Sequence, residues 1–140
     1  MTDEGGSTEI LLIMGELNAK HNRAVWVDIP VAELDRAIQF YSKVLAINVS
    51  KEQFGDIVFG VLEHGEGNGG CLVVQPENVS KTGILVYMNV DGRIRDAVSK
   101  VSQNGGEVVT DTHSIGPHGF RALVLDSEGN RLALHSETDA

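Results

Sequence analysis

The chain has 140 residues, with 20 acidic side chains against 11 basic ones and a formal net charge of −9. This length suits one domain with its own apolar core, and no apolar run is long enough to span a membrane. The acidic balance argues against binding nucleic acid, because phosphate contacts require clustered Lys and Arg.

Residues 1–22 are predicted to form an arm outside the main domain. Their opening, MTDEGGSTEI, is acidic and polar, unlike the basic start of a signal peptide. The apolar stretch Ile10–Met14 follows, and it suits packing on a partner subunit. The only cysteine, Cys71, has no partner for an internal disulfide. We therefore expect a cytoplasmic protein.

The next segment is predicted to hold one strand, one helix and three further strands. The first strand covers 24–29 and ends at Pro30. A helix over 33–45 follows from apolar residues spaced along one face, namely Leu34, Ala37, Ile38, Tyr41 and Leu45. Glycine-rich turns then separate strands expected at 47–53, 56–63 and 70–75.

The same order is predicted again in the second half of the chain. A strand at 83–90 and a helix at 93–103 precede strands at 107–112, 120–126 and 131–135. When LDRAI (34–38) is laid over IRDAV (94–98), Val49 also falls on Val109. Duplication explains this pattern. The prediction is an α+β fold in which one domain, 23–140, holds two βαβββ modules at about 23–76 and 83–136.

Three segments resemble the vicinal oxygen chelate superfamily of glyoxalases, bleomycin-resistance proteins and extradiol dioxygenases. They are VDIPVAELDRAIQFYSKVL (27–45), VYMNVDGRIRDAVSKVSQNGGEVV (86–109) and DSEGNRLALH (126–135). The suggested branch is the lactoylglutathione-lyase-related group. The resemblance implies cupped mixed sheets with helices on their convex sides. It also implies a cleft in which both modules hold a divalent metal ion, and a homodimer.

The positions that the resemblance assigns to metal ligands do not hold suitable side chains. They fall on Trp26, Cys71, Leu85 and Ala133, none of which is a histidine or a carboxylate. A divalent ion in such a cleft requires about three or four imidazole or carboxylate ligands. We therefore expect no metal and no cofactor.

The side chains facing the cleft are predicted from strand alternation. Three alternating sets are expected to pack under the helices: Val25, Val27 and Ile29; Ile84, Val86, Met88 and Val90; and Leu132 and Leu134. The predicted ligand-binding residues on the other face are Trp26, Asp28, Val73, Gln75, Leu85, Tyr87, Asn89, Arg131, Ala133 and His135. This mixture of apolar and polar groups suits a small organic ligand.

Other functions remain open alternatives to metal-free ligand binding. A displaced metal site built from Asp28, His135 and a loop histidine, His113 or His118, would indicate a lyase, an isomerase or a dioxygenase. Cys71 beside His135 would form a nucleophile pair. A cleft filled by its own side chains would indicate a purely structural or regulatory dimer.

Overall fold

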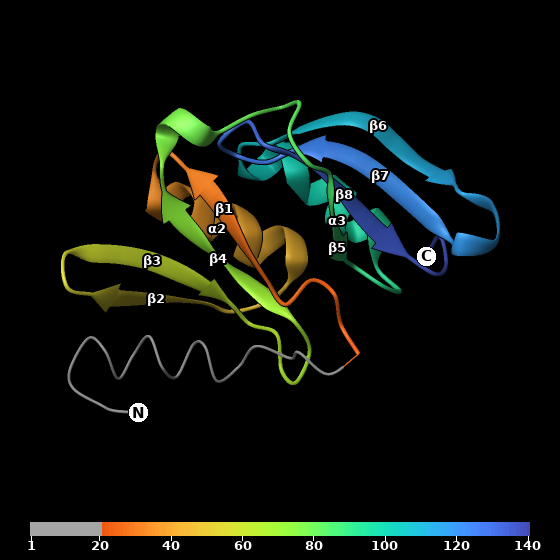
Figure 1. The fold of residues 1–140 in the computed structure, drawn as a ribbon. Helices are drawn as coiled ribbons and strands as arrows, with labels where there is room; N and C mark the ends of the chain where they lie inside the picture. Colours follow the sequence, from red (N-terminus) through yellow and green to blue (C-terminus); the bar gives the residue numbers. More distant parts are fainter. Residues whose placement is uncertain (1–20) are drawn as a thin grey trace.

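Residues 21–140, described by a computed structural model, fold into the two predicted βαβββ modules (Figure 1). The first module holds β1 (Trp26–Val31), α2 (Leu34–Leu45), β2 (Val49–Phe54), β3 (Ile57–Leu62) and β4 (Gly69–Val74). The second holds β5 (Val86–Asn89), α3 (Ile94–Val101), β6 (Glu107–Ser114), β7 (Phe120–Leu125) and β8 (Arg131–Ser136). The 3-10 helices are η1 (Pro76–Asn78), η2 (Ser102–Asn104) and η3 (Gly116–His118). The expected arm lies almost wholly outside the described residues.

Each module carries one four-stranded mixed sheet, which confirms the predicted α+β class. The strand orders are β1-β4-β3-β2 and β5-β8-β7-β6. In both sheets the first strand pairs in parallel with the last, and the other pairs are antiparallel. The helices α2 and α3 contact each other and lie behind the sheets in Figure 1. Within residues 21–140, no helix is long and apolar enough to cross a membrane.

Several strand limits differ from the predicted ones, and two of the differences have a clear physical cause. The first strand continues through Pro30 to Val31, because β1 is an edge strand and an edge tolerates a residue without an N–H. The strand expected from residue 83 begins only at Val86, and Ile84 is 91% exposed instead of joining the core. Its parallel partner β8 begins at Arg131, so Ile84 has no strand residue to pair with.

One apolar core joins the two modules. Phe40 and Tyr41 of α2 and Ile94 and Val101 of α3 are fully buried in the same cluster, together with side chains from the helix-facing sides of both sheets. Burial of this apolar surface is the main favourable contribution to folding. The two modules therefore share one core.

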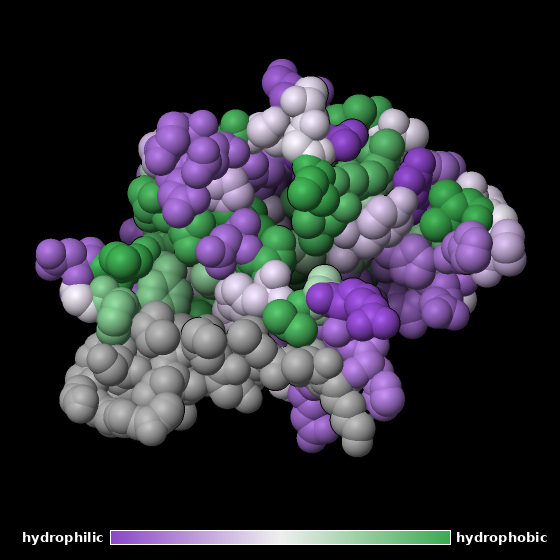
Figure 2. All heavy atoms as spheres, in the orientation of Figure 1, coloured by the Kyte–Doolittle hydropathy of each residue, from purple (hydrophilic) through white to green (hydrophobic). Residues whose placement is uncertain are grey.

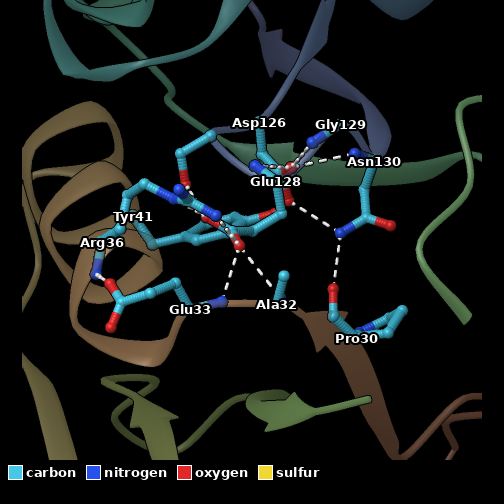
Figure 3. Close-up of polar contacts among 10 residues, drawn as sticks. Pro30, Ala32, Glu33, Arg36, Tyr41, Asp126, Glu128, Gly129 and Asn130 are labelled. Atoms are coloured by element: carbon cyan, nitrogen blue, oxygen red, sulfur yellow. Dashed lines mark hydrogen bonds and ion pairs between the residues drawn. The ribbon is translucent and has the colours of Figure 1, made fainter. Parts of the chain in front are cut away.

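The turn between β7 and β8 reaches across to the start of α2. The Glu128 carboxylate accepts hydrogen bonds from the backbone N–H groups of Ala32 and Glu33, each at 2.9 Å. It also accepts from Nε of Arg36 at 2.8 Å (Figure 3). These N–H groups precede the first helical turn and have no partner within the helix. A side chain of the second module thus supplies hydrogen-bond acceptors to the backbone N–H groups at the N-terminus of α2.

A buried carboxylate, Asp126, lies beside this contact. Its Oδ2 accepts from the Tyr41 hydroxyl at 2.5 Å and from the Asn130 side chain at 3.0 Å (Figure 3). The same Asn130 amide donates to the Pro30 carbonyl at 2.7 Å. Burial, with the nearby Asp126 charge, raises the pKa of the Tyr41 hydroxyl well above its usual value, so it stays protonated and donates. Asp126, Glu128 and Asn130 together form an inter-module clasp.

Replacing Glu128 with Gln tests the clasp. Burial alone would disfavour the Glu128 charge, but hydrogen bonds from Arg36 and from the backbone of Glu33 and Ala32 outweigh it and lower the pKa to about 2. A carboxyl whose folded pKa lies below its ordinary value of 4.5 stabilises the fold above that pH. This stabilisation is lost as the pH falls toward the folded pKa.

We expect Glu128→Gln to lower the free energy of unfolding by about 1–3 kcal/mol at pH 7. Because protonation of Glu128 removes its stabilising charge from the wild-type protein, the difference in unfolding free energy between wild type and Glu128→Gln should shrink toward pH 2. Urea denaturation at both pH values measures it, with Glu77→Gln, on the exposed η1 helix, as the control. A deficit that is the same at both pH values would contradict the role assigned to the Glu128 charge.

Candidate functional site

The side of each sheet opposite its helix is its open face. In β1, Ile29 and Val31 join the core, whereas Asp28 is exposed. In β5, Met88 joins the core, whereas Tyr87 is 48% exposed. The predicted assignment of faces is therefore confirmed for these strands. It is also confirmed for β8, where Leu132 and Leu134 enter the core and Arg131 is exposed.

The open face of the first module pairs a thiol with a carboxylate. Cys71 of β4 lies opposite Asp28 of β1, and its Sγ donates to Asp28 Oδ1 at 3.3 Å. Burial, together with the Asp28 charge, raises the pKa of the Cys71 thiol to about 12. The thiolate that attacks electrophiles or binds metals is therefore scarce near neutral pH. Cys71 and His135 belong to different sheets, so the suggested nucleophile pair lacks support.

The same strand register recurs in the second module. Tyr87 of β5 lies opposite Ala133 of β8, as Asp28 lies opposite Cys71 in the first module. Counting two residues back from Asp28 and from Tyr87 gives Trp26 in β1 and Leu85, which immediately precedes β5. This register supports the equivalence of the positions compared in the sequence.

These positions do not fit a metal ion. Trp26, Leu85 and Ala133 have no side-chain lone pair suited to a divalent cation, and Cys71 is held as a thiol. Among residues 21–140, no three His, Cys, Asp or Glu side chains gather in an arrangement that could hold a metal. The chemistry of this donor set gives no support to a metal-dependent step.

A cavity of about 610 Å³ opens on the second module. It is lined by Tyr87, Met88, Asn89, Ile115, His118, Arg121 and His135. Its walls come from β5, β7, β8 and the segment around η3. This second-module cavity combines apolar surface with several polar groups, which is typical of small-molecule sites.

Arg121 lies at the centre of the polar contacts in this cavity. Its Nη1 donates to the Tyr87 hydroxyl at 2.5 Å, and its Nε donates to Nε2 of His113 at 3.1 Å. His113 in turn donates from Nδ1 to the Asp111 carbonyl at 2.8 Å. This chain of contacts fixes one His113 tautomer, with the proton on Nδ1. It also holds the guanidinium group in place, 6.0 Å from the centre of the Tyr87 ring.

Arg121 was missed by the sequence reasoning, although a signal for it existed. In β7 the alternate residues Ala122 and Val124 are fully buried in the core, so Arg121 belongs to the open face. The register places it opposite His135. The segments that resemble the superfamily do not include β7, whereas they do include Arg131 on the neighbouring strand.

His135 has one ring nitrogen already engaged. Its Nε2 bonds to the His118 carbonyl at 2.7 Å, and its ring centre lies 6.3 Å from that of Tyr87. Only Nδ1 is left for another partner. The carbonyl contact fixes the imidazole at the cavity wall.

The ten predicted ligand-binding residues do not line one common cavity. Tyr87, Asn89 and His135 line the second-module cavity. Trp26, which makes an edge-on contact with the His64 ring, lines a cavity of about 730 Å³ between β1 and β5 that also includes Tyr87 and Asn89.

The remaining predicted residues lie elsewhere. Asp28 and Arg131 share a third cavity of about 270 Å³. Val73, Gln75, Leu85 and Ala133 line none of these three cavities. The predicted set is therefore divided among three cavities and positions outside them, and the two cavities that hold Trp26, Asp28 and Arg131 are lined by residues of both modules.

Comparisons with known proteins agree on one family. The family model described as Glyoxalase/Bleomycin resistance protein/Dioxygenase superfamily matches residues 23–134. A glyoxylase-like domain-containing protein from Didymella fabae is 28% identical over 121 residues, which cover 81% of this chain and 93% of that protein.

Solved structures show the same fold. A glyoxalase/bleomycin resistance protein from Albidiferax ferrireducens superposes with a TM-score of 0.66 at 13% identity, covering 82% of this chain and 98% of that one. A genomically encoded fosfomycin resistance protein from Listeria monocytogenes gives 0.64 at 10% identity, covering 82% and 93%. At these identities the likeness concerns the fold alone.

Cys71 is expected to be unreactive in the folded protein. Because its raised pKa leaves little thiolate at pH 8, alkylation by iodoacetamide should be at least about tenfold slower than in the same protein unfolded in urea. Mass spectrometry of timed samples measures both rates. Equal rates would show that the thiol is neither buried nor held by Asp28.

Proposed function

The chain belongs to the glyoxalase/bleomycin resistance protein/dioxygenase superfamily, and we propose that it binds a small organic ligand in the second-module cavity without a protein-held metal ion. The observation that carries this proposal is the fixed polar cluster of Arg121, Tyr87 and His113 on the wall of a partly apolar cavity. Apolar burial supplies affinity, and a few placed polar groups supply orientation.

The other predicted residues extend this proposal toward the first module. Tyr87, Met88 and Asn89 line both the second-module cavity and the larger cavity that includes Trp26. A ligand longer than the first cavity would therefore reach toward Trp26. Asp28 and Arg131 contact the ligand only if it is longer still, and Ala133 is fully buried and therefore not a ligand contact.

The alternative is a metal-dependent lyase, isomerase or dioxygenase that uses Asp28, His135 and a loop histidine. Two observations disfavour it. Asp28 and His135 line different cavities, and Nε2 of His135 already bonds to the His118 carbonyl. The third possibility, a cleft filled by its own side chains, is disfavoured by the open second-module cavity.

We also propose that the protein is a homodimer. Large apolar side chains stay exposed on a single chain, among them Ile57, Val74 and Ile84. Figure 2 shows apolar surface along the segment that leads into β5. Covering such surface with a second copy would remove it from water. Membership of the lactoylglutathione-lyase-related group and a cytoplasmic location stay predictions.

The oligomeric state is tested directly by sedimentation equilibrium. We expect a mass of twice 15.1 kDa at micromolar concentration. Ile84→Asp should shift the population toward the monomer, because it places a charge in apolar surface that the dimer would bury. A monomer at all concentrations would contradict the proposed homodimer and leave the ligand site unaffected.

Ligand binding is tested with a library of small aromatic and aliphatic fragments. We expect hits to shift the amide NMR signals of Tyr87 and His135, and Tyr87→Ala to weaken these hits about fivefold or more through loss of the aromatic wall. Val109→Ala is the matched control, since Val109 is 57% exposed and outside the three cavities.

The same sample tests the metal-free part of the proposal. After incubation with zinc, nickel, manganese or iron(II) salts and desalting, elemental analysis should find well below one metal ion per chain. One tightly bound ion per chain, lost in Asp28→Ala and in His135→Ala, would favour the displaced-site enzyme instead. If no fragment shifts the Tyr87 or His135 signals, the proposed ligand binding is contradicted.

A further inference from the structure

The second-module cavity carries a positive group although the chain as a whole is acidic. The formal net charge is −9, yet the cavity lining includes Arg121 and two histidines and no Asp or Glu. Such a local excess of positive charge in a concave site favours negatively charged ligands. The lining therefore differs from the rest of the molecule in the sign of its charge.

Arg121 has no carboxylate partner among residues 21–140. The ion pairs in this part of the chain engage other cations, namely Arg36, Lys51, Arg93, Arg95 and Lys100. Arg121 is half-buried, and its contacts are with the neutral Tyr87 hydroxyl and the acceptor nitrogen of His113. A partly desolvated charge without an opposite charge is costly. An anion in the cavity would offset this cost.

The guanidinium group is also arranged for such an anion. Arginine has five N–H donors, and two of those on Arg121 are used, one by Tyr87 and one by His113. The Tyr87 hydroxyl accepts from Arg121, so its own proton is available for a ligand oxygen. Because both partners fix the guanidinium, little side-chain entropy is lost when an anion binds.

We propose that Arg121 is the anion anchor of this cavity, so that its ligand is an organic acid whose carboxylate bonds to the Arg121 guanidinium. The apolar remainder of the acid would pack on Tyr87 and Ile115, which line the same cavity. Planar guanidinium and carboxylate groups match in geometry and form strong paired hydrogen bonds. This inference rests on the proposed ligand-binding function and names the ligand class.

The experiment compares two probes of nearly the same shape, the anion benzoate and the neutral amide benzamide. NMR titrations follow the amide signals of Tyr87 and His135 and the Nε signal of Arg121. For the wild-type protein we expect benzoate to bind at least about tenfold more tightly than benzamide, since a charge-assisted pair is stronger than a neutral one. Equal affinities would overturn the anion anchor.

Variants assign the effect to Arg121. Arg121→Gln should remove the preference for benzoate over benzamide, whereas Arg121→Lys should keep part of it. Arg95→Gln is the matched control, because Arg95 is an exposed arginine on α3, and its affinity for benzoate should equal that of wild type. Circular dichroism checks that each variant is folded.

The outcomes separate this inference from the function on which it rests. If both probes shift the Tyr87 and His135 signals with no preference for charge, the anchor is overturned and the ligand site stands. If Arg121→Gln binds benzoate as tightly as Arg95→Gln does, the anchor is likewise overturned and the ligand site stands. If neither probe nor any other fragment shifts these signals, both the anchor and the ligand site are overturned.

Discussion

The buried carboxylate of Asp126 determines how the two modules of this chain meet. A buried carboxylate is tolerated only when its oxygens accept hydrogen bonds, and here they accept from three backbone N–H groups of the β7–β8 turn, from Asn130 and from Tyr41. This fixes the turn, and Tyr41 ties it to α2. The turn also fixes the register of β7 on β8, which places Arg121 opposite His135. The inter-module clasp and the candidate site thus depend on one hairpin.

Much of this fold followed from local patterns in the sequence. Alternation in β8 correctly placed Leu132 and Leu134 in the core, because one face of a half-buried strand must be apolar. Helical periodicity located α2 and correctly placed Leu34, Ala37 and Tyr41 on its buried face, although it did not identify Phe40. The outward position of Ile84 was not predictable in this way, since its cause is where the partner strand begins.

The clasp and the Arg121 cluster also lay beyond sequence reasoning. Glu128 contacts residues almost a hundred positions earlier in the chain. The periodicity of apolar residues within a helix or strand gives no information about such a distant contact. Strand alternation could have placed Arg121 on the open face. The position of its partner His113, however, depends on an irregular stretch of the pairing between β6 and β7. β-Bulges of this kind re-aim side chains and often occur beside sites. Pattern rules that assume regular alternation fail at such positions.

The two modules share a backbone arrangement but differ in chemistry. The pairs Asp28–Cys71 and Tyr87–Ala133 occupy the same register, yet the first open face holds a carboxylate and the second holds a cation. In the related superfamily a metal ion is expected to attract ligand oxygens at the convergence of both modules. Arg121 offers a fixed positive charge to such oxygens from one module alone. Because exposed charges more than about 8 Å away are largely screened at physiological salt, distant acidic groups of the exterior oppose a bound anion only weakly. Selectivity for an anion would therefore arise inside the cavity, from the hydrogen bonds of Arg121 and Tyr87.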